Sequence, residues 1–323
     1  MNILIIGVGQ IGSRHLEAIS KIKKKKNIYL IEPNQDSINT ALELYKAVKK
    51  NNLDNIETFN QLSELKKNIN IDFCIIATAA DVRYLNFERL LEVVSIKHII
   101  FEKVLFQSLN HYEIVKQKLF DNNIKGWVNC VRRYYQLYKD LKEFIKPNMP
   151  IEMNIFGDTD NGMACNIIHY IDLMNFLSQS FISTINTSGI DKEILPAKRE
   201  GFIEFSGKTV CNFSDGSRLS FSSLRNKSLE NIVTIKQNGL EFIYNEANGI
   251  TKISNNGSFH ESVNLMPYQS ELTNLVIEDL FQSNTCKLVD YNTSVRLHVP
   301  IIRGLLKFYN STLKKNVLKL PIT

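Results

Sequence analysis

The chain has 323 residues, of which 44% are hydrophobic, and its formal net charge is +6. This length allows about two domains of roughly 150 residues each, and the hydrophobic fraction argues against a disordered chain. No apolar run reaches the roughly 18 residues of a membrane-spanning helix, and the apolar start predicts a strand rather than a signal peptide. One lysine run, at residues 21–26, reads as the solvated end of a helix and not as a nucleic-acid site.

Five cysteines are scattered along the chain without a Cys-x-x-Cys pair. Their odd number argues against a disulfide framework, and their spacing argues against a zinc site. We therefore expect a reduced, cytoplasmic protein without a metal centre.

Strand and helix signals alternate in the first part of the chain. Apolar runs predict buried strands, and apolar residues at helical spacing predict the helices between them. The predicted strands are residues 3–6, 28–31, 73–77 and 98–101, and the predicted helices are residues 11–23, 36–50 and 82–94. Buried strands separated by helices indicate a parallel sheet covered on both faces. We therefore predict an N-terminal, doubly wound Rossmann domain at residues 1–122.

The pattern changes after Trp127. Strands are predicted at residues 128–135 and 151–156, and helices at residues 137–145, 163–177, 268–281 and 292–309. Between about residues 182 and 253, short strand-like runs follow one another, several of them joined by glycine turns. This pattern predicts a C-terminal α+β domain at residues 123–323 with a large, mostly antiparallel, open-faced sheet. Whether the closing helix and tail pack back on the first domain stays open.

Three glycines, Gly7, Gly9 and Gly12, follow the first predicted strand directly. In a Rossmann fingerprint the first makes the tight turn, the second lets the backbone approach a pyrophosphate, and the third lets the helix pack on the strand. Glu32 ends the second strand, where an acid binds the ribose hydroxyls of NAD and repels the 2′-phosphate of NADP. The pattern favours NAD over NADP, although related folds hold FAD or S-adenosylmethionine on the same motif and a bare structural turn stays an alternative.

Two further stretches contain candidate catalytic groups. Lys103 follows the predicted strand 98–101, at the sheet edge where ligands bind in open α/β folds. On the predicted helix 163–177, His169 and Asp172 share a face, which suits a histidine acid/base beside a carboxylate. Taken singly, these stretches also fit a surface Glu-Lys pair and a structural core histidine.

These parts in this order resemble the Gfo/Idh/MocA oxidoreductases. The resemblance rests on the glycine turn with Ser13-Arg14-His15, on Glu102-Lys103, on Asn129 with Arg132-Arg133, and on His169-x-x-Asp172. It implies a Rossmann domain followed by an open-faced sheet domain. It also implies NAD(P)-dependent chemistry on sugars, polyols or sugar derivatives, in subunits that associate through the sheet.

The resemblance also implies roles for individual residues. Lys103 would hydrogen-bond the nicotinamide ribose and the substrate oxygen, His169 would be the acid/base, and Asp172 would bind substrate or tune His169. The predicted cofactor-binding residues are Gly7, Gly9, Gln10, Ile11, Gly12, Glu32, Ala77, Thr78, Glu102 and Lys103. The predicted substrate-binding residues are Arg132, Arg133, Asn166 and His169. The arginines are included because guanidinium groups bind phosphate or carboxylate, and their alternative role is a strand-edge charge facing water.

Four positions depart from the family pattern. Val104 replaces the proline after the lysine, so we expect no cis peptide bond there. Ala79 replaces a second proline, Cys165 replaces an aspartate, and Ile167 replaces a glycine. These changes fit a changed substrate and a weakened activity equally well.

The sequence therefore predicts an NAD-dependent dehydrogenase or reductase. It would transfer a hydride between NAD(H) and a carbinol or keto carbon of a sugar or sugar derivative, nucleotide-linked or acidic, in surface-polysaccharide synthesis. We expect a homodimer or homotetramer formed through the C-terminal sheet, without nucleic-acid or membrane partners. Two alternatives stay open. One is a net non-redox reaction with recycled NAD, as in an epimerase, dehydratase or glycosidase, and the other is a non-catalytic dinucleotide-binding sensor or partner subunit.

Overall fold

The computed structural model describes residues 1–49, 54–159, 162–225 and 229–323, so the last residue of the predicted helix 36–50 lies outside the described residues. The chain forms two compact units. The first comprises residues 1–106, 110–129 and 267–292, and the second comprises residues 107–109, 130–266 and 293–323. The first unit thus extends beyond the predicted boundary at residue 122, and a late segment of the chain returns to it.

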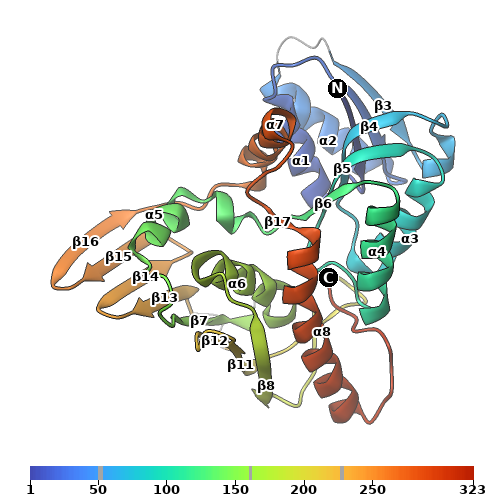
Figure 1. Ribbon diagram of the computed structural model, residues 1–323. Helices are drawn as coiled ribbons and strands as arrows, with labels where there is room; N and C mark the ends of the chain where they lie inside the picture. Colours follow the sequence, from blue (N-terminus) through green and yellow to red (C-terminus); the bar gives the residue numbers. More distant parts are fainter. Residues whose placement is uncertain (50–53, 160–161, 226–228) are drawn as a thin grey trace. The chain divides into compact units, whose positions relative to one another are not determined.

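A seven-stranded sheet forms the centre of the first unit, in the order β17-β6-β5-β4-β1-β2-β3 (Figure 1). The strands are β1 (Asn2–Ile6), β2 (Asn27–Ile31), β3 (Asn55–Phe59), β4 (Asn70–Ile76), β5 (Ser95–Phe101), β6 (Lys125–Val128) and β17 (Val289–Asp290). Neighbouring strands pair in parallel, except that β17 is antiparallel to β6. This arrangement confirms the predicted doubly wound parallel sheet.

Helices cover both faces of this sheet. The helices of the first unit are α1 (Gln10–Ser20), α2 (Gln35–Val48), η1 (Leu62–Glu64), α3 (Ala80–Leu91), α4 (Leu109–Asp121), η4 (Gln269–Glu271) and α7 (Thr273–Ser283). In Figure 1, α1, α2 and α7 lie on one side of the sheet, and α3 and α4 lie on the other. Because both faces are covered, the apolar residues 3–6 of β1 are almost completely buried.

The predicted strand at residues 128–135 is wrong. Pairing with β5 ends at Asn129, whose N–H donates to the Phe101 carbonyl at 2.9 Å, and the 3-10 helix η2 (Val131–Tyr134) begins two residues later. The alternating run of apolar and polar residues resembles a strand, but Arg132 is itself buried with Val131 and Tyr134. An ion pair, described below, holds that arginine inside.

An eight-stranded sheet dominates the second unit, in the order β16-β15-β14-β13-β7-β12-β11-β8. Its strands are β7 (Glu152–Asp158), β8 (Ile182–Ile190), β11 (Gly207–Phe213), β12 (Arg218–Leu224), β13 (Ile232–Gln237), β14 (Leu240–Asn245), β15 (Ile250–Asn255) and β16 (Ser258–Val263). Strands β9 (Leu195–Pro196) and β10 (Ile203–Glu204) form a separate pair. Among the described strands of the large sheet, only β7 and β12 pair in parallel, which confirms the mostly antiparallel prediction.

One face of the large sheet is apolar and buried. On β7, Met153 and Ile155 are buried, whereas the next residue, Phe156, is on the other face and 41% exposed. The helices of this unit are α5 (Gln136–Phe144), α6 (Met163–Ser178) and α8 (Tyr291–Leu313). Helix α6 lies along the sheet in Figure 1, and its Tyr170 ring meets that of Phe221 on β12 at 5.5 Å between centroids. The sheet therefore supports the helix that carries His169.

The C-terminal tail is part of the second unit. Leu320 and Ile322 are fully buried. The Leu320 N–H donates to the Gln107 carbonyl at 3.0 Å, and the Gln107 amide donates to the Ile322 carbonyl at 3.1 Å. The tail thus meets a segment of the predicted first domain, but residues 107–109 belong to the second compact unit.

The lysine run after α1 is not uniformly solvated. Lys23, Lys24 and Lys25 are exposed, but Lys26 is fully buried and its ammonium lies 3.0 Å from the Asp54 carboxylate. Burial lowers the pKa of Lys26 to about 8, partly offset by Asp54. The expectation of a solvated helix end is therefore wrong for this residue. No described helix is both long enough and apolar enough to cross a membrane.

Candidate active site

Two of the three glycines after β1 are required by close backbone contacts. Gly7 has a φ of +85°, and a Cβ on it would lie 2.9 Å from the Thr78 backbone nitrogen. A Cβ on Gly12 would lie 1.9 Å from the Gly7 carbonyl oxygen. A side chain at Gly7 would therefore collide with the loop after β4, and a side chain at Gly12 would push α1 away from the turn after β1.

Gly9 is different because the fold itself does not require a glycine there. A Cβ on Gly9 would have no atom within 4 Å, and its φ of −67° is ordinary. Gly9 is also the N-cap of α1, which has neither a side-chain cap nor an acidic residue in its first turn. The unfilled space therefore lies at a helix N-terminus, where the backbone N–H groups favour an anion. These observations fit the pyrophosphate of a dinucleotide.

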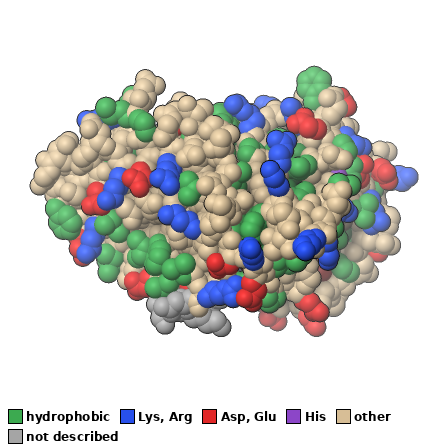
Figure 2. All heavy atoms as spheres, turned by 90° about the horizontal axis from the view of Figure 1, so that it is seen from below, with side chains coloured by type: hydrophobic (Ala, Val, Ile, Leu, Met, Phe, Trp, Pro, Cys, Tyr) green, Lys and Arg blue, Asp and Glu red, His purple; other side chains and the backbone are tan. Residues whose placement is uncertain are grey.

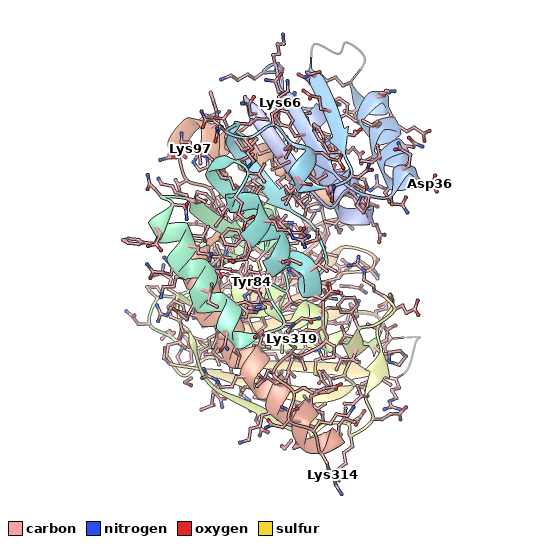
Figure 3. All side chains as sticks on the ribbon, turned by 90° about the vertical axis from the view of Figure 1, so that its right-hand side faces the viewer. Asp36, Lys66, Tyr84, Lys97, Lys314 and Lys319 are labelled. Carbon is pink, nitrogen blue, oxygen red and sulfur yellow. The ribbon has the colours of Figure 1, made fainter. Side chains whose placement is uncertain are left out.

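A pocket of about 270 Å³ adjoins this turn. It is lined by Val8, Gly9, Gln10, Ser13, Asn34, Asp36, Ser37 and Thr40. The Glu32 carboxylate accepts the Val8 N–H at 2.8 Å and the Asn34 N–H at 3.0 Å, so it joins the glycine turn to the start of α2. Asp36, labelled in Figure 3, adds a second carboxylate in the first turn of α2. Among the residues that the structure describes, this lining holds no lysine or arginine, which favours a ribose without a 2′-phosphate.

The structure brings Ala77 and Thr78 to the same turn. The Ala77 N–H donates to the Ile6 carbonyl at 2.8 Å, and Thr78 limits the space above Gly7. Gln10 and Ile11 form the start of α1, and the Ile11 side chain is 41% exposed. Ala77 and Thr78 thus lie against the glycine turn between β1 and α1.

Arg83 was not predicted as a site residue. It is 1% exposed and donates to the Thr78 and Val104 carbonyls, and to the Leu105 carbonyl at 3.0 Å. It therefore joins the loop after β4 to the loop that carries Lys103. Its position on the buried stripe of α3, with Phe87 and Leu90, was a signal that this arginine points inward.

The peptide bond between Lys103 and Val104 is cis, so the expectation from the missing proline is wrong. Val104 is buried, and its carbonyl is one of the three that Arg83 holds. The Arg83 hydrogen bond and the burial of Val104 therefore hold this turn, at the position where the family pattern has a proline.

Glu102 is the centre of a buried polar network. His15 meets one carboxylate oxygen at 3.0 Å, Asn129 donates to the same oxygen, and the Lys103 N–H meets the other at 3.3 Å. The pKa of Glu102 is lowered, because hydrogen bonding and charge from His15, together with Lys103 and Asn129, outweigh the raising effect of burial. The ionised carboxylate thus fixes the backbone at Lys103.

This network continues to the late segment of the first unit. The other ring nitrogen of His15 lies 2.7 Å from the Thr273 hydroxyl, and Gln269 bonds both Asn129, at 3.0 Å, and Thr273, at 2.9 Å. The family motif residues His15 and Asn129 therefore act together, through Glu102. Sequence alone did not connect them with η4 and α7.

In the second unit, α6 carries the predicted acid/base group. Asn166 and His169 are half-buried, whereas Asp172, one turn later, is fully buried. The Asp172 carboxylate accepts three hydrogen bonds of 2.7–3.0 Å from Arg133, which also donates to Asn175 at 2.9 Å. Burial raises the pKa of Asp172, and Arg133 opposes this shift. Asp172 and Arg133 therefore form a bidentate pair.

Arg132 also has a carboxylate partner, which sequence analysis missed. Glu246 accepts from the Arg132 guanidinium at 2.8 Å and from the Tyr170 hydroxyl at 2.8 Å. The guanidinium carbon lies 4.3 Å from the centre of the Tyr170 ring. Although burial lowers the pKa of Arg132, the Glu246 charge outweighs it and the pKa is raised.

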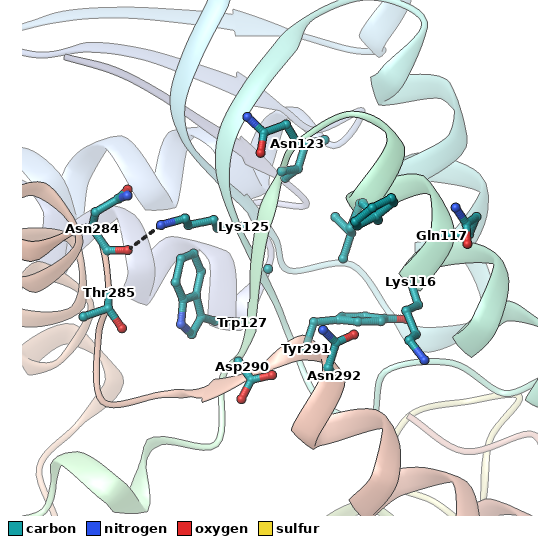
Figure 4. Close-up of a pocket in the computed structure, with 14 residues that line it drawn as sticks. Lys116, Gln117, Asn123, Lys125, Trp127, Asn284, Thr285, Asp290, Tyr291 and Asn292 are labelled. Atoms are coloured by element: carbon teal, nitrogen blue, oxygen red, sulfur yellow. Dashed lines mark hydrogen bonds between the residues drawn. The ribbon is translucent and has the colours of Figure 1, made fainter.

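A second pocket, of about 690 Å³, lies beside β6 in the first unit (Figure 4). Figure 4 shows Trp127, Tyr291 and several amide side chains around it, with the Lys125 ammonium 3.4 Å from the Asn284 carbonyl. All predicted site residues are described, and none of them lines this pocket. It is therefore separate from the candidate active site. In the described ranges, no cluster of three or more His, Cys, Asp or Glu side chains could hold a metal ion.

The comparison with protein families finds a match in the first part of the chain. Residues 1–129 match the GFO_IDH_MocA model, described as an oxidoreductase family with an NAD-binding Rossmann fold. This part of the chain is therefore similar to the Gfo/Idh/MocA family, which agrees with the resemblance found in the sequence. A search of curated protein sequences gives no significant match.

Solved structures show the same fold over nearly the whole chain. UDP-N-acetylglucosamine 3-dehydrogenase from Acidithiobacillus ferrooxidans is 13% identical, with a TM-score of 0.68 over 95% of this chain and 96% of that one. Myo-inositol dehydrogenase from Lactobacillus casei, solved with NAD(H) and myo-inositol, is 15% identical, with a TM-score of 0.68 over 99% and 98%. Biliverdin reductase from a Synechocystis species, solved with NADP+, is 10% identical, with a TM-score of 0.70 over 94% and 97%. At these identities the likeness shows the fold alone.

Arg83 provides a test of how the site loops are held. Arg83→Met should lower the free energy of unfolding by about 2–4 kcal/mol, because buried carbonyls lose their donor. Denaturant unfolding measures this change. Arg89→Met, on the exposed side of the same helix, is the matched control and should cost less than about 0.5 kcal/mol. Equal stability of the two variants would contradict the role given to Arg83.

Proposed function

We propose that this protein transfers a hydride between NAD(H) and the carbinol or keto carbon of a sugar-type substrate. The observation that carries the proposal is the position of Lys103. It directly follows β5 in a loop that Arg83 ties to Thr78 beside the glycine turn. A lysine at the carboxyl edge of a Rossmann sheet is where a reacting hydroxyl meets the cofactor.

We assign the cofactor residues the roles that the glycine motif and the family resemblance imply. The N-terminus of α1, with Gly9, Gln10 and Ile11, would hold the pyrophosphate, and Glu32 would bind the adenosine ribose. Ala77, Thr78 and Lys103 would lie along the nicotinamide half, and Glu102 supports Lys103 from behind. When bound, NAD supplies the acceptor for the hydride of a carbinol carbon, which becomes a keto carbon.

The protein groups would manage the proton that leaves the hydroxyl. The Lys103 ammonium would donate a hydrogen bond to the substrate oxygen, and the His169 imidazole would accept the hydroxyl proton. In the reverse direction His169 would return it. The Arg133–Asp172 pair would fix the second half of α6, and Asn166 would bind a substrate hydroxyl beside His169.

A hydroxyl-rich substrate is supported by two of the structural neighbours. Their names give UDP-N-acetylglucosamine and myo-inositol as substrate or ligand. We place this protein in sugar metabolism on that basis, with surface-polysaccharide synthesis as the proposed context. A cytoplasmic location is proposed from the cysteine usage, which suits a reducing compartment.

We also propose a homodimer or homotetramer built through the large sheet. The edge strand β16 exposes Phe259 and Val263, at 65% and 68%, and a sheet edge offers unpaired backbone groups to a partner. In Figure 2, hydrophobic side chains are interspersed with charges of both signs. On the sheet, cross-strand pairs such as Lys236–Glu241, at 2.7 Å, supply such charges.

Glu32 predicts the choice of coenzyme. NADH should bind at least about tenfold more tightly than NADPH, which is roughly 1.4 kcal/mol. In Glu32→Gln the preference should shrink, because the amide oxygen can still accept the Val8 N–H but the charge is gone. Calorimetric titration of both coenzymes measures this preference. Glu43→Gln, an exposed change on α2, is the control. Equal affinities in the wild-type protein would contradict the role of Glu32.

Substitution of Lys103 or His169 tests the catalytic assignment. Lys103→Met and His169→Asn should each lower kcat by about 100-fold or more, with NADH affinity nearly unchanged. Initial rates of NADH formation with a panel of sugars and polyols measure this loss. Lys97 is an exposed lysine on β5, the strand before the loop that carries Lys103, and Lys97→Met should keep wild-type rates. Wild-type turnover in both site variants would refute the assignment and favour a different catalytic centre.

A further inference from the structure

We propose that the part of the substrate that meets α6 is uncharged and rich in hydroxyl groups, and is neither a carboxylate nor a phosphate. This inference rests on the proposed function, with Asn166 and His169 facing the substrate. It narrows the sequence prediction, which left an acidic sugar open because of the two arginines. The internal partners of those arginines and of the α6 N-terminus carry the argument.

The first cation, Arg132, is neutralised inside the protein. Its side chain is 9% exposed, and that of its partner Glu246 is 6% exposed. Tyr170 donates to the second Glu246 oxygen and also stacks beneath the guanidinium. An incoming anion would have to compete with a carboxylate that is already desolvated and hydrogen-bonded. Breaking such a buried pair is strongly unfavourable, because it leaves an uncompensated charge inside the protein.

The second cation, Arg133, is held in the same way. Its Nε and Nη2 atoms donate to both oxygens of Asp172, whose side chain is fully buried. Bidentate pairing uses the guanidinium edge that would otherwise grip a carboxylate or phosphate. Its further bond to Asn175 fixes the guanidinium against α6. Arg133 therefore orders the helix rather than offering a charge to substrate.

A carboxylate of the protein itself also occupies the N-terminus of α6. Glu204, on β10, accepts the Ala164 N–H at 2.7 Å and the Cys165 N–H at 3.0 Å. These N–H groups would otherwise form an anion site. Glu204 is 7% exposed, so its carboxylate fills this place instead of solvent. It lies beside Cys165, the position where the family pattern has an aspartate.

Both arginines and the N-terminus of α6 therefore have internal carboxylate partners, and this disfavours an anion at those groups. Glu246 pairs with Arg132, Asp172 pairs with Arg133, and Glu204 accepts the first N–H groups of the helix. The half-buried positions of the first half of α6 are Cys165, Asn166 and His169, a thiol, an amide and an imidazole. An amide and an imidazole suit hydroxyl groups, which both donate and accept hydrogen bonds. A nucleotide diphosphate elsewhere on the substrate would be compatible with this face.

The test compares substrates that differ only in one charge. UDP-glucose against UDP-glucuronate and glucose against glucuronate are titrated into the wild-type protein with NADH present. Any pair that binds should favour its neutral member by at least about tenfold, or roughly 1.4 kcal/mol. An acidic member that binds as tightly as its neutral partner, or more tightly, would overturn the inference.

A second measurement uses tartrate and inorganic phosphate as probes and needs no substrate. In the wild-type protein, Arg132 should not contribute to anion binding. Any saturable binding of tartrate or phosphate should therefore persist in Arg132→Met. Glu246→Gln should gain such binding, because it leaves Arg132 uncompensated, and Asp172→Asn should do the same for Arg133. Glu143→Gln, an equal charge change at an exposed position on α5, should gain nothing.

The outcomes separate the two proposals. Arg132-dependent anion binding by the wild-type protein would overturn the inference, and so would folded Glu246→Gln and Asp172→Asn variants that gain none. If Glu246→Gln does not fold, Asp172→Asn and the wild-type comparison still decide. NADH binding is measured alone in every protein. Its absence would defeat the proposed function, whereas NADH binding with a preference for acids would defeat only the inference.

Discussion

The contact between Gly7 and Gly12 is the constraint on which the rest of the site depends. Because a Cβ on Gly12 would fall 1.9 Å from the Gly7 carbonyl oxygen, α1 can start directly against the end of β1 only with glycine there. This close start brings the α1 N-terminus to the carboxyl edge of the parallel sheet. Ala77 and Thr78 reach the same edge from β4, and Glu32 reaches it from β2.

Buried polar groups then hold the loops at that edge. Arg83 fixes the loops after β4 and β5 through their carbonyls, and Glu102, held by His15 and Asn129, fixes the backbone of Lys103. A buried charge is costly unless it is hydrogen-bonded, so these groups define one arrangement of the loops. In the second unit the same principle pairs Arg132 with Glu246 and orders α6.

Local patterns in the sequence predicted what local physics determines. Apolar runs and helical spacing predicted the strands β1, β2, β4 and β5 and the helices α1, α2 and α3, but not α4 or β6. A glycine turn of the kind predicted for the second unit joins β13 to β14 at Asn238-Gly239. The edge strands β3 and β16 were missed, because they are largely exposed and carry no apolar run. Glu246, Glu204 and Arg83 were missed as site residues for another reason. Their partners lie far away in the sequence or on backbone carbonyls, and one sequence does not reveal such pairings.

The most direct test of the account is NADH binding by Gly9→Ala. Because a Cβ at Gly9 meets no atom within 4 Å, the variant should fold and melt like the wild-type protein. If the space belongs to a pyrophosphate, calorimetry should show NADH affinity reduced at least about tenfold, roughly 1.4 kcal/mol. Unchanged affinity in the folded variant, or no NADH binding by the folded wild-type protein, would contradict the claim that this turn holds the cofactor.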